Sequence, residues 1–179
     1  MDCLWDVRAE LGEGPLWLDD EQALLFVDID GRRLHRYGLG DGRMDSWALP
    51  WRVGCVVRRR RGGFLLGSEA GVLALQALPS GGPAALTDDD VTVLARPTAG
   101  QADTRLNDGT CDAAGRFWFG SMDQACERAV GALWRMDPDH GVHAVARGYA
   151  VSNGPALAPD GCVLYHADTV RGVIEAYPC

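Results

Sequence analysis

Residues 109–137 read GTCDAAGRFWFGSMDQACERAVGALWRMD, and this stretch decides the fold. It opens on a glycine and a few small residues, followed by a turn (DAAGR). A strong strand (RFWFGSM) comes next, and a second turn leads to another strand (GALWRMD). Strands rich in aromatic and aliphatic residues, bounded by Gly and Asp turns, are typical of antiparallel β-structure.

The same order of glycine, turn, strand, turn and strand occurs three more times, in units that begin at Gly14, Gly54 and Gly154. Successive units start 40, 55 and 45 residues apart, close to the repeat of about 40–50 residues expected of a propeller blade. Helical periodicity is nowhere sustained. We therefore predict an all-β fold, a β-propeller of about four blades that forms one partial domain over residues 1–179. A β-sandwich would not explain the shared order.

Composition excludes several classes of function. Apolar residues make up 47% of the 179, and the formal net charge is −8. A globular protein with a sizeable core is expected, and nucleic acid is excluded as the main partner. No run approaches the ~20 apolar residues of a membrane helix. The start of the chain shows no signal peptide, so we expect a cytoplasmic location without membrane contact.

The six cysteines carry no functional signal. They are scattered without a C-x-x-C pair, so free thiols are favoured over disulfides or a structural zinc site. Likewise, the four histidines show no ligand spacing.

Oxygen-bearing side chains recur just before the glycine that opens three of the units. They are Glu13, Asn107 and Asn153, whereas the second unit offers only Val53. Each could merely form a turn, because Asx side chains bond nearby backbone. Their recurrence favours one axial site for a divalent cation, and a carboxylate with two amides suits Ca²⁺, Mg²⁺ or Mn²⁺, with Zn²⁺ also accommodated.

Two further residues are candidates for contact with a substrate. Arg105 precedes Asn107 by two positions, and its planar set of donors could orient a polar or anionic group. Asp123, in the segment GSMD, is a weaker candidate. For Arg105, the alternative is a surface loop residue.

Three motifs resemble one family. LGEGP near the start, RLNDGTCDAAGRFWFGSM in the middle and SNGPALAPDGCVLYHADT near the end are similar to those of the senescence-marker-protein/gluconolactonase/luciferin-regenerating-enzyme (regucalcin-like) family. The resemblance implies a six-bladed propeller with one axial divalent metal ion and hydrolysis of sugar lactones. It also implies that Glu13 and Asn153 bind the metal, and that Arg105 and Asn107 lie around metal and substrate.

One part of the family pattern is not found. The resemblance implies a further aspartate, both metal ligand and base, in a P-D-G-type segment well beyond the S-N-G motif. Asp160 lies in a P-D-G triplet but at a turn position of the repeat, and Asp168 follows a second strand. The catalytic base is therefore unassigned and expected beyond Cys179, with about two blades missing.

The predicted function is metal-dependent hydrolysis of a sugar lactone. The alternatives are a calcium-binding propeller without turnover and an inactive fragment of a lactonase. The segment Cys3–Leu11 is expected to be a closing strand, and self-association through open propeller edges is expected of the chain made alone.

Overall fold

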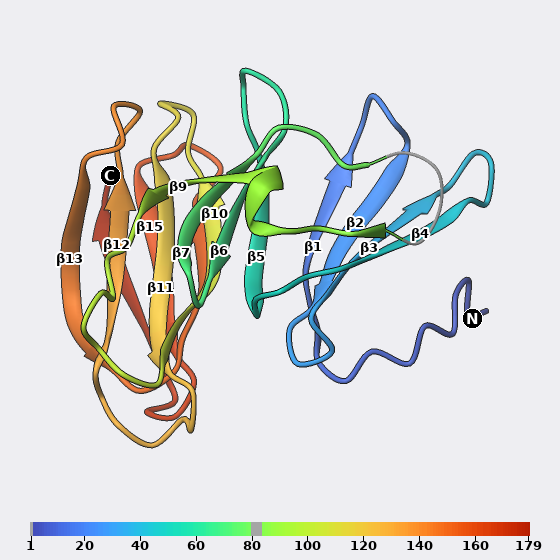
Figure 1. Cartoon of the computed structure of the whole chain (residues 1–179). Helices are drawn as coiled ribbons and strands as arrows, with labels where there is room; N and C mark the ends of the chain where they lie inside the picture. Colours follow the sequence, from blue (N-terminus) through green and yellow to red (C-terminus); the bar gives the residue numbers. More distant parts are fainter. Residues whose placement is uncertain (1, 80–83) are drawn as a thin grey trace.

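The computed structural model describes residues 2–79 and 84–179. Four mainly antiparallel sheets follow one another around an arc, each built from neighbouring strands of the chain (Figure 1). This arrangement confirms the prediction of an all-β propeller with four blades.

Blades 1 and 2 come from the first half of the chain. The strands of blade 1 are β1 (Gly12–Leu18), β2 (Ala23–Asp28), β3 (Arg33–Gly38) and β4 (Met44–Ala48). Those of blade 2 are β5 (Val53–Arg58), β6 (Phe64–Ser68), β7 (Gly71–Leu75) and β9 (Val91–Ala95). The connector before β9 contains the 3-10 turn η1 (Asp88–Asp90) and the short strand β8 (Ala84–Ala85), which pairs in parallel with β4. Blade 2 is thereby tied to blade 1.

Blades 3 and 4 come from the second half of the chain, blade 3 with four strands and blade 4 with three. The strands of blade 3 are β10 (Thr104–Cys111), β11 (Phe117–Asp123), β12 (Gly131–Met136) and β13 (Val142–Tyr149). Those of blade 4 are β14 (Ser152–Leu157), β15 (Val163–Asp168) and β16 (Val173–Pro178). The first strand of each blade, β1, β5, β10 or β14, contacts its counterpart in the next blade. These four inner strands therefore line the propeller axis.

Apolar side chains fill the spaces between successive blades. Leu25 and Leu66 belong to the cluster between blades 1 and 2, and stacked Phe117 and Phe119 to the one between blades 2 and 3. All five residues of β6 are buried, because both faces of blade 2 are covered, whereas β16 alternates between intermediate and exposed positions. Ile174 in β16 is 74% exposed. Self-association through this strand stays a prediction.

The segment Cys3–Leu11 differs from its prediction. It forms no strand; instead the backbone N–H groups of Glu10 and Leu11 donate to the Asp28 carboxylate, at 3.1 and 2.9 Å. Trp5 packs edge-on against His35. A side-chain acceptor and an aromatic contact thus hold this segment against blade 1 without a strand ladder.

Two predictions about composition can be compared with the described residues. All six cysteines are unpaired there, as expected, with Cys55 buried in the core. Among the same residues, no helix has the length and hydropathy to cross a membrane.

Gly54 marks the closest approach of two inner strands. A Cβ added there would stand 2.6 Å from the carbonyl oxygen of Asn107 and 2.7 Å from its Cα. Neither backbone atom can move aside as a flexible side chain could. Small residues were expected in these strands, and the crowding at Gly54 gives the reason.

Replacing Gly54 by alanine is expected to lower the free energy of unfolding by about 1–3 kcal/mol, since β5 and β10 must separate to admit the methyl group. Gly40→Ala is the matched control, because a Cβ at Gly40 meets nothing within 4 Å. Urea unfolding followed by tryptophan fluorescence measures both variants. Equal stability of the two would show that the inner strands are not closely packed.

Candidate functional site at the axial mouth

A β-bulge interrupts every inner strand close to its start. The register shifts between Glu13 and Leu16 in β1, between Leu106 and Gly109 in β10, and between Asn153 and Ala156 in β14. A shift of the same one residue occurs in β5, between Val53 and Cys55. Bulges twist a strand and re-aim its side chains. The glycine motifs of the sequence therefore mark the bulges of the inner strands.

The strand register corrects one alignment made from the sequence. Glu13 pairs with Val27 and Asn153 with Ala167, each one residue before the aspartate that ends the second strand of its blade. In blade 3 the residue so placed is Arg105, which pairs with Met122. Asn107 lies two residues further along, inside the bulge of β10. Counted from the strand-ending aspartate, this bulge begins one residue later than those of β1 and β14.

The register also places the bulge of blade 2. Val53 pairs with Ser68, the last residue of β6, and Cys55 pairs with Gly67 before it, so Gly54 is the extra residue of the bulge. The backbone of Asn107 presses on Gly54 and leaves no room for a side chain. The bulge of blade 2 therefore carries no side chain at Gly54, for a steric reason.

Direct contacts run from one inner strand to the next at the level of the bulges. A Cβ on Gly14 would lie 3.4 Å from the carbonyl oxygen of Gly54, and Gly54 in turn abuts Asn107. The Asn107 side-chain amide donates to the Ser152 carbonyl at 2.8 Å. Glu13, Arg105, Asn107 and Asn153 thus lie on bulged inner strands that contact in succession. Their convergence on one point stays a prediction.

Arg105 and Asn107 form a buried polar pair. Each is only 8% exposed, and the Arg105 guanidinium donates to the Asn107 side-chain oxygen. Burial lowers the pKa of Arg105, which is nonetheless charged at neutral pH. A buried guanidinium beside an amide provides fixed donors for the oxygens of a bound ligand.

The donors suited to a cation are Glu13 and Asn153. Glu13 is exposed and, in the described part of the chain, has no hydrogen bond or ion pair. Among the residues that the structure describes, the Asn153 side-chain oxygen accepts only from the backbone N–H of Gly154, at 3.0 Å. Both oxygens fit a hard divalent ion. The oxygen of Asn107 already accepts from a positively charged group, so it fits a ligand contact better than a metal bond.

The described residues contain no group of three or more Asp, Glu, His or Cys side chains that could hold a metal ion. A cation at the mouth would therefore need the amide oxygen of Asn153 together with the Glu13 carboxylate. This donor set is poor in nitrogen and sulfur, which favours Ca²⁺, Mg²⁺ or Mn²⁺ over Zn²⁺.

An aspartate ends the second strand of blades 1, 3 and 4, and its carboxylate accepts hydrogen bonds from backbone N–H groups. Asp168 accepts from the N–H groups of Ala150 and Val170, both at 3.1 Å, and Asp28 has the same role in blade 1. In blade 3 the residue is Asp123, which is fully buried and accepts from the side chain and backbone of Arg128. Both of its carboxylate oxygens already accept hydrogen bonds. A contact of Asp123 with substrate stays a prediction.

Asp160 lies in the turn between β14 and β15, where its carboxylate accepts from the backbone N–H of Cys162 at 2.9 Å. This is the turn position expected from the repeat. Beneath the mouth, the Ser152 hydroxyl bonds to His166 at 2.6 Å, with both residues fully buried. Burial lowers the pKa of His166 to about 4, so this histidine is a neutral packing group.

One residue of the site was not a sequence-based candidate. Asp108 is the second bulge residue of β10, and its carboxylate accepts from the N–H groups of Gly109 and Gly154, at 2.8 and 3.1 Å. Burial raises its pKa, although these two N–H groups oppose the shift. The signal was the N-D-G triplet itself, which looks like an ordinary turn when its partner strand is unknown.

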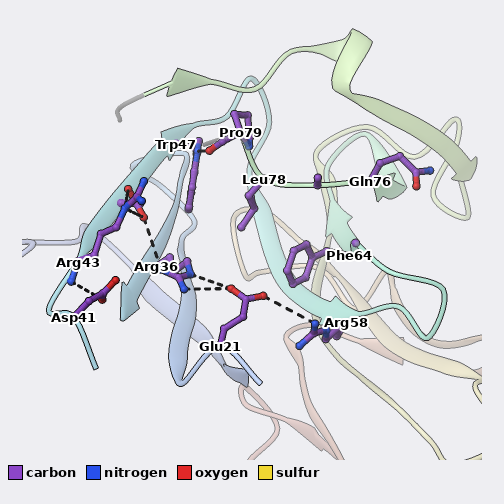
Figure 2. A pocket seen from close by; sticks show the side chains of 13 residues that line it. Glu21, Arg36, Asp41, Arg43, Trp47, Arg58, Phe64, Gln76, Leu78 and Pro79 are labelled. Atoms are coloured by element: carbon purple, nitrogen blue, oxygen red, sulfur yellow. Dashed lines mark hydrogen bonds and ion pairs between the residues drawn. The ribbon is translucent and has the colours of Figure 1, made fainter. Parts of the chain in front are cut away.

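A cleft of about 380 Å³ lies between blades 1 and 2, at the end of β1 away from the mouth (Figure 2). Its charged residues pair with one another: Arg36 with Glu21, and Arg58 with Asp20 and Glu21. Trp47 donates to the Pro79 carbonyl at 3.0 Å. The cleft is thus held by contacts that join the two blades, and it contains none of the candidate residues.

Comparison with known proteins gives a consistent result. Residues 11–179 match the profile described as the SMP-30/Gluconolactonase/LRE-like region. The chain is 36% identical over 176 residues to 6-deoxy-6-sulfogluconolactonase of Pseudomonas putida and 34% identical over 179 residues to L-arabinolactonase of Azospirillum brasilense. Regucalcin of Xenopus laevis is 31% identical over 181 residues. Each alignment covers 98% of this chain but only 56–58% of the relative.

Solved structures agree on the fold. A luciferin-regenerating enzyme superposes with a TM-score of 0.85 at 25% identity, over 94% of this chain and 55% of that protein. A calcium-binding protein, regucalcin from Agrobacterium tumefaciens, gives 0.82 at 24% identity over 94% and 54%. The chain therefore spans about half the length of the proteins it resembles.

The buried Asp123 predicts a dependence of stability on pH. Hydrogen bonds from the Arg128 side chain and from backbone N–H groups lower the pKa of Asp123 to about 2. The stabilisation is therefore complete above the ordinary pKa of 3.8 and is lost as the pH falls toward 2. We expect Asp123→Asn to be less stable than the wild type at pH 7, and the gap to close at low pH.

Unfolding free energies from pH 7 to pH 2 measure this effect. Asp139→Asn, a change in an exposed turn of the same blade, serves as the control and should show no comparable gap. A constant difference between wild type and Asp123→Asn over the whole range would contradict the assignment.

Proposed function

Because the chain belongs to the SMP-30/gluconolactonase/LRE-like family, we propose that it contributes to the hydrolysis of a sugar lactone with one divalent cation at the axial mouth. The observation that carries the proposal is the buried Arg105–Asn107 pair, on a bulged strand between those that hold Glu13 and Asn153. Fixed donors beside free oxygen ligands suit an oxygen-rich substrate. Two of the relatives are named 6-deoxy-6-sulfogluconolactonase and L-arabinolactonase, after sugar lactones of this kind.

Glu13 and Asn153 would hold the cation, with Asn107 as the weaker third candidate. When bound, a Ca²⁺, Mg²⁺, Mn²⁺ or Zn²⁺ ion supplies Lewis-acid polarisation of a carbonyl and lowers the pKa of coordinated water. The chain's own contribution is to keep these oxygens on closely packed strands, so that little reorganisation accompanies binding.

Arg105 and Asn107 would orient the substrate. Arg105 donates through its guanidinium, and its hydrogen bond to Asn107 fixes the direction of both groups. Fixing the lactone ring raises the rate because less orientational freedom is lost on the way to the transition state. Asp123 stays a predicted substrate contact.

The general base is unassigned in these 179 residues. The carboxylates of Asp160 and Asp168 both accept hydrogen bonds from backbone N–H groups. The family resemblance implies an aspartate in a further segment, and the relatives are longer than this chain. A cytoplasmic location remains the expectation from the sequence.

A second candidate function is binding of a divalent cation without turnover. It is favoured by the exposed, unpaired Glu13 carboxylate and by the similarity to regucalcins. Release of acid from glucono-lactone, followed with and without EDTA, separates the candidates. EDTA-sensitive hydrolysis supports the enzyme, calcium binding without hydrolysis supports the binder, and hydrolysis that survives EDTA contradicts the role of the metal.

We expect Arg105→Ala to lower lactone hydrolysis by about 10–100-fold, because a charged hydrogen-bond donor is lost. Calcium binding, measured by calorimetry, should persist, because arginine has no lone pair to offer an ion. Arg61→Ala, in the exposed turn of blade 2, is the matched control. Loss of calcium binding in Arg105→Ala with unchanged hydrolysis would show that Arg105 acts on the metal site instead.

A further inference from the structure

Asp108 links the two motifs that hold the candidate site. It belongs to the bulge of β10, whereas one of its hydrogen-bond donors, the N–H of Gly154, belongs to the bulge of β14. Its other oxygen accepts from its own neighbour Gly109. The carboxylate thus spans the boundary between blades 3 and 4.

The Gly154 N–H is shared between two acceptors. It lies 3.1 Å from a carboxylate oxygen of Asp108 and 3.0 Å from the side-chain oxygen of Asn153. An amide oxygen that turns to a cation is a weaker acceptor for its own backbone. Without a second acceptor, the half-buried N–H of Gly154 would compete with the ion for the oxygen of Asn153.

Asn153 is also held from its other side. The side chain of Asn107 donates to the carbonyl of Ser152, the residue before Asn153, while Asp108 accepts from Gly154, the residue after it. Two adjacent residues of one bulge, Asn107 and Asp108, therefore form hydrogen bonds with the peptide groups on both sides of Asn153.

We propose that Asp108 is a positioning residue: by accepting the Gly154 N–H, it leaves the side-chain oxygen of Asn153 free for the cation. The inference rests on the proposed metal role of Asn153. Asp108 acts through the backbone of β14 and need not touch the ion or the substrate.

Calorimetric titration of the whole chain with calcium tests the proposal. Asp108→Ala removes both acceptor oxygens and should weaken calcium binding by about tenfold or more. Asp108→Asn removes the same charge but keeps one oxygen, so its loss should be clearly smaller. Asp160→Asn, which neutralises an aspartate in a turn of blade 4, should bind calcium as the wild type does.

Equal losses in Asp108→Ala and Asp108→Asn would show that only the negative charge matters and would overturn the positioning role. Unchanged affinity in both would overturn it as well. Thermal melts of each variant establish that the fold is kept, and Asp108→Asn, the milder change, carries the test if Asp108→Ala does not fold.

The backbone amide of Gly154 gives a readout that does not need the metal. In ¹H–¹⁵N spectra, its proton should lie further downfield in the wild type than in Asp108→Ala, because a charged acceptor deshields it. A wild type that binds no calcium would count against the proposed function. The hydrogen bond from the Gly154 N–H to Asp108 would then be supported by this shift, and it would be refuted by a Gly154 resonance that Asp108→Ala leaves unmoved.

Discussion

The close packing of the four inner strands governs the rest of the molecule. At Gly54 the backbone of β10 lies where any other residue would carry its Cβ. This contact keeps the bulge of β5 without a side chain at Gly54 and holds β5 close against β10. The hydrogen bond that Asn107 donates to the Ser152 carbonyl, together with the one that Asp108 accepts from the Gly154 N–H, then fixes the boundary between blades 3 and 4.

The architecture could be predicted from the sequence because each unit carries its own local signals. Glycine, turn residues and aromatic strands recur in order, and the sheets follow those units closely. The segment Cys3–Leu11 was the exception. Its apolar residues suggested a strand, but the Asp28 carboxylate accepts its N–H groups instead. An acceptor 17 residues away is not visible in a local pattern.

The candidate site was predictable in its residue types but not in its register. Counting back from glycine placed Asn107 with Glu13 and Asn153, whereas the ladder places Arg105 there. A bulge adds a residue without leaving a mark in composition, and its position along β10 differs from that in β1 and β14, so a count back from glycine does not give the register. Asp108 was missed for a related reason, since its partner Gly154 comes from the next blade.

The strand-ending aspartates divide the contacts of the propeller into two kinds. Asp28 and Asp168 tie the segment that enters a blade to the turn inside that same blade. Asn107 and Asp108, in contrast, join different blades. Blades 1 and 4 are therefore each closed by their own residues, as in a repeat protein whose stability is a sum of internal and interface terms. The contacts of Asn107 and Asp108 belong to an interface instead: a small rotation of blade 4 against blade 3 would change them while each blade kept its own strand pairing.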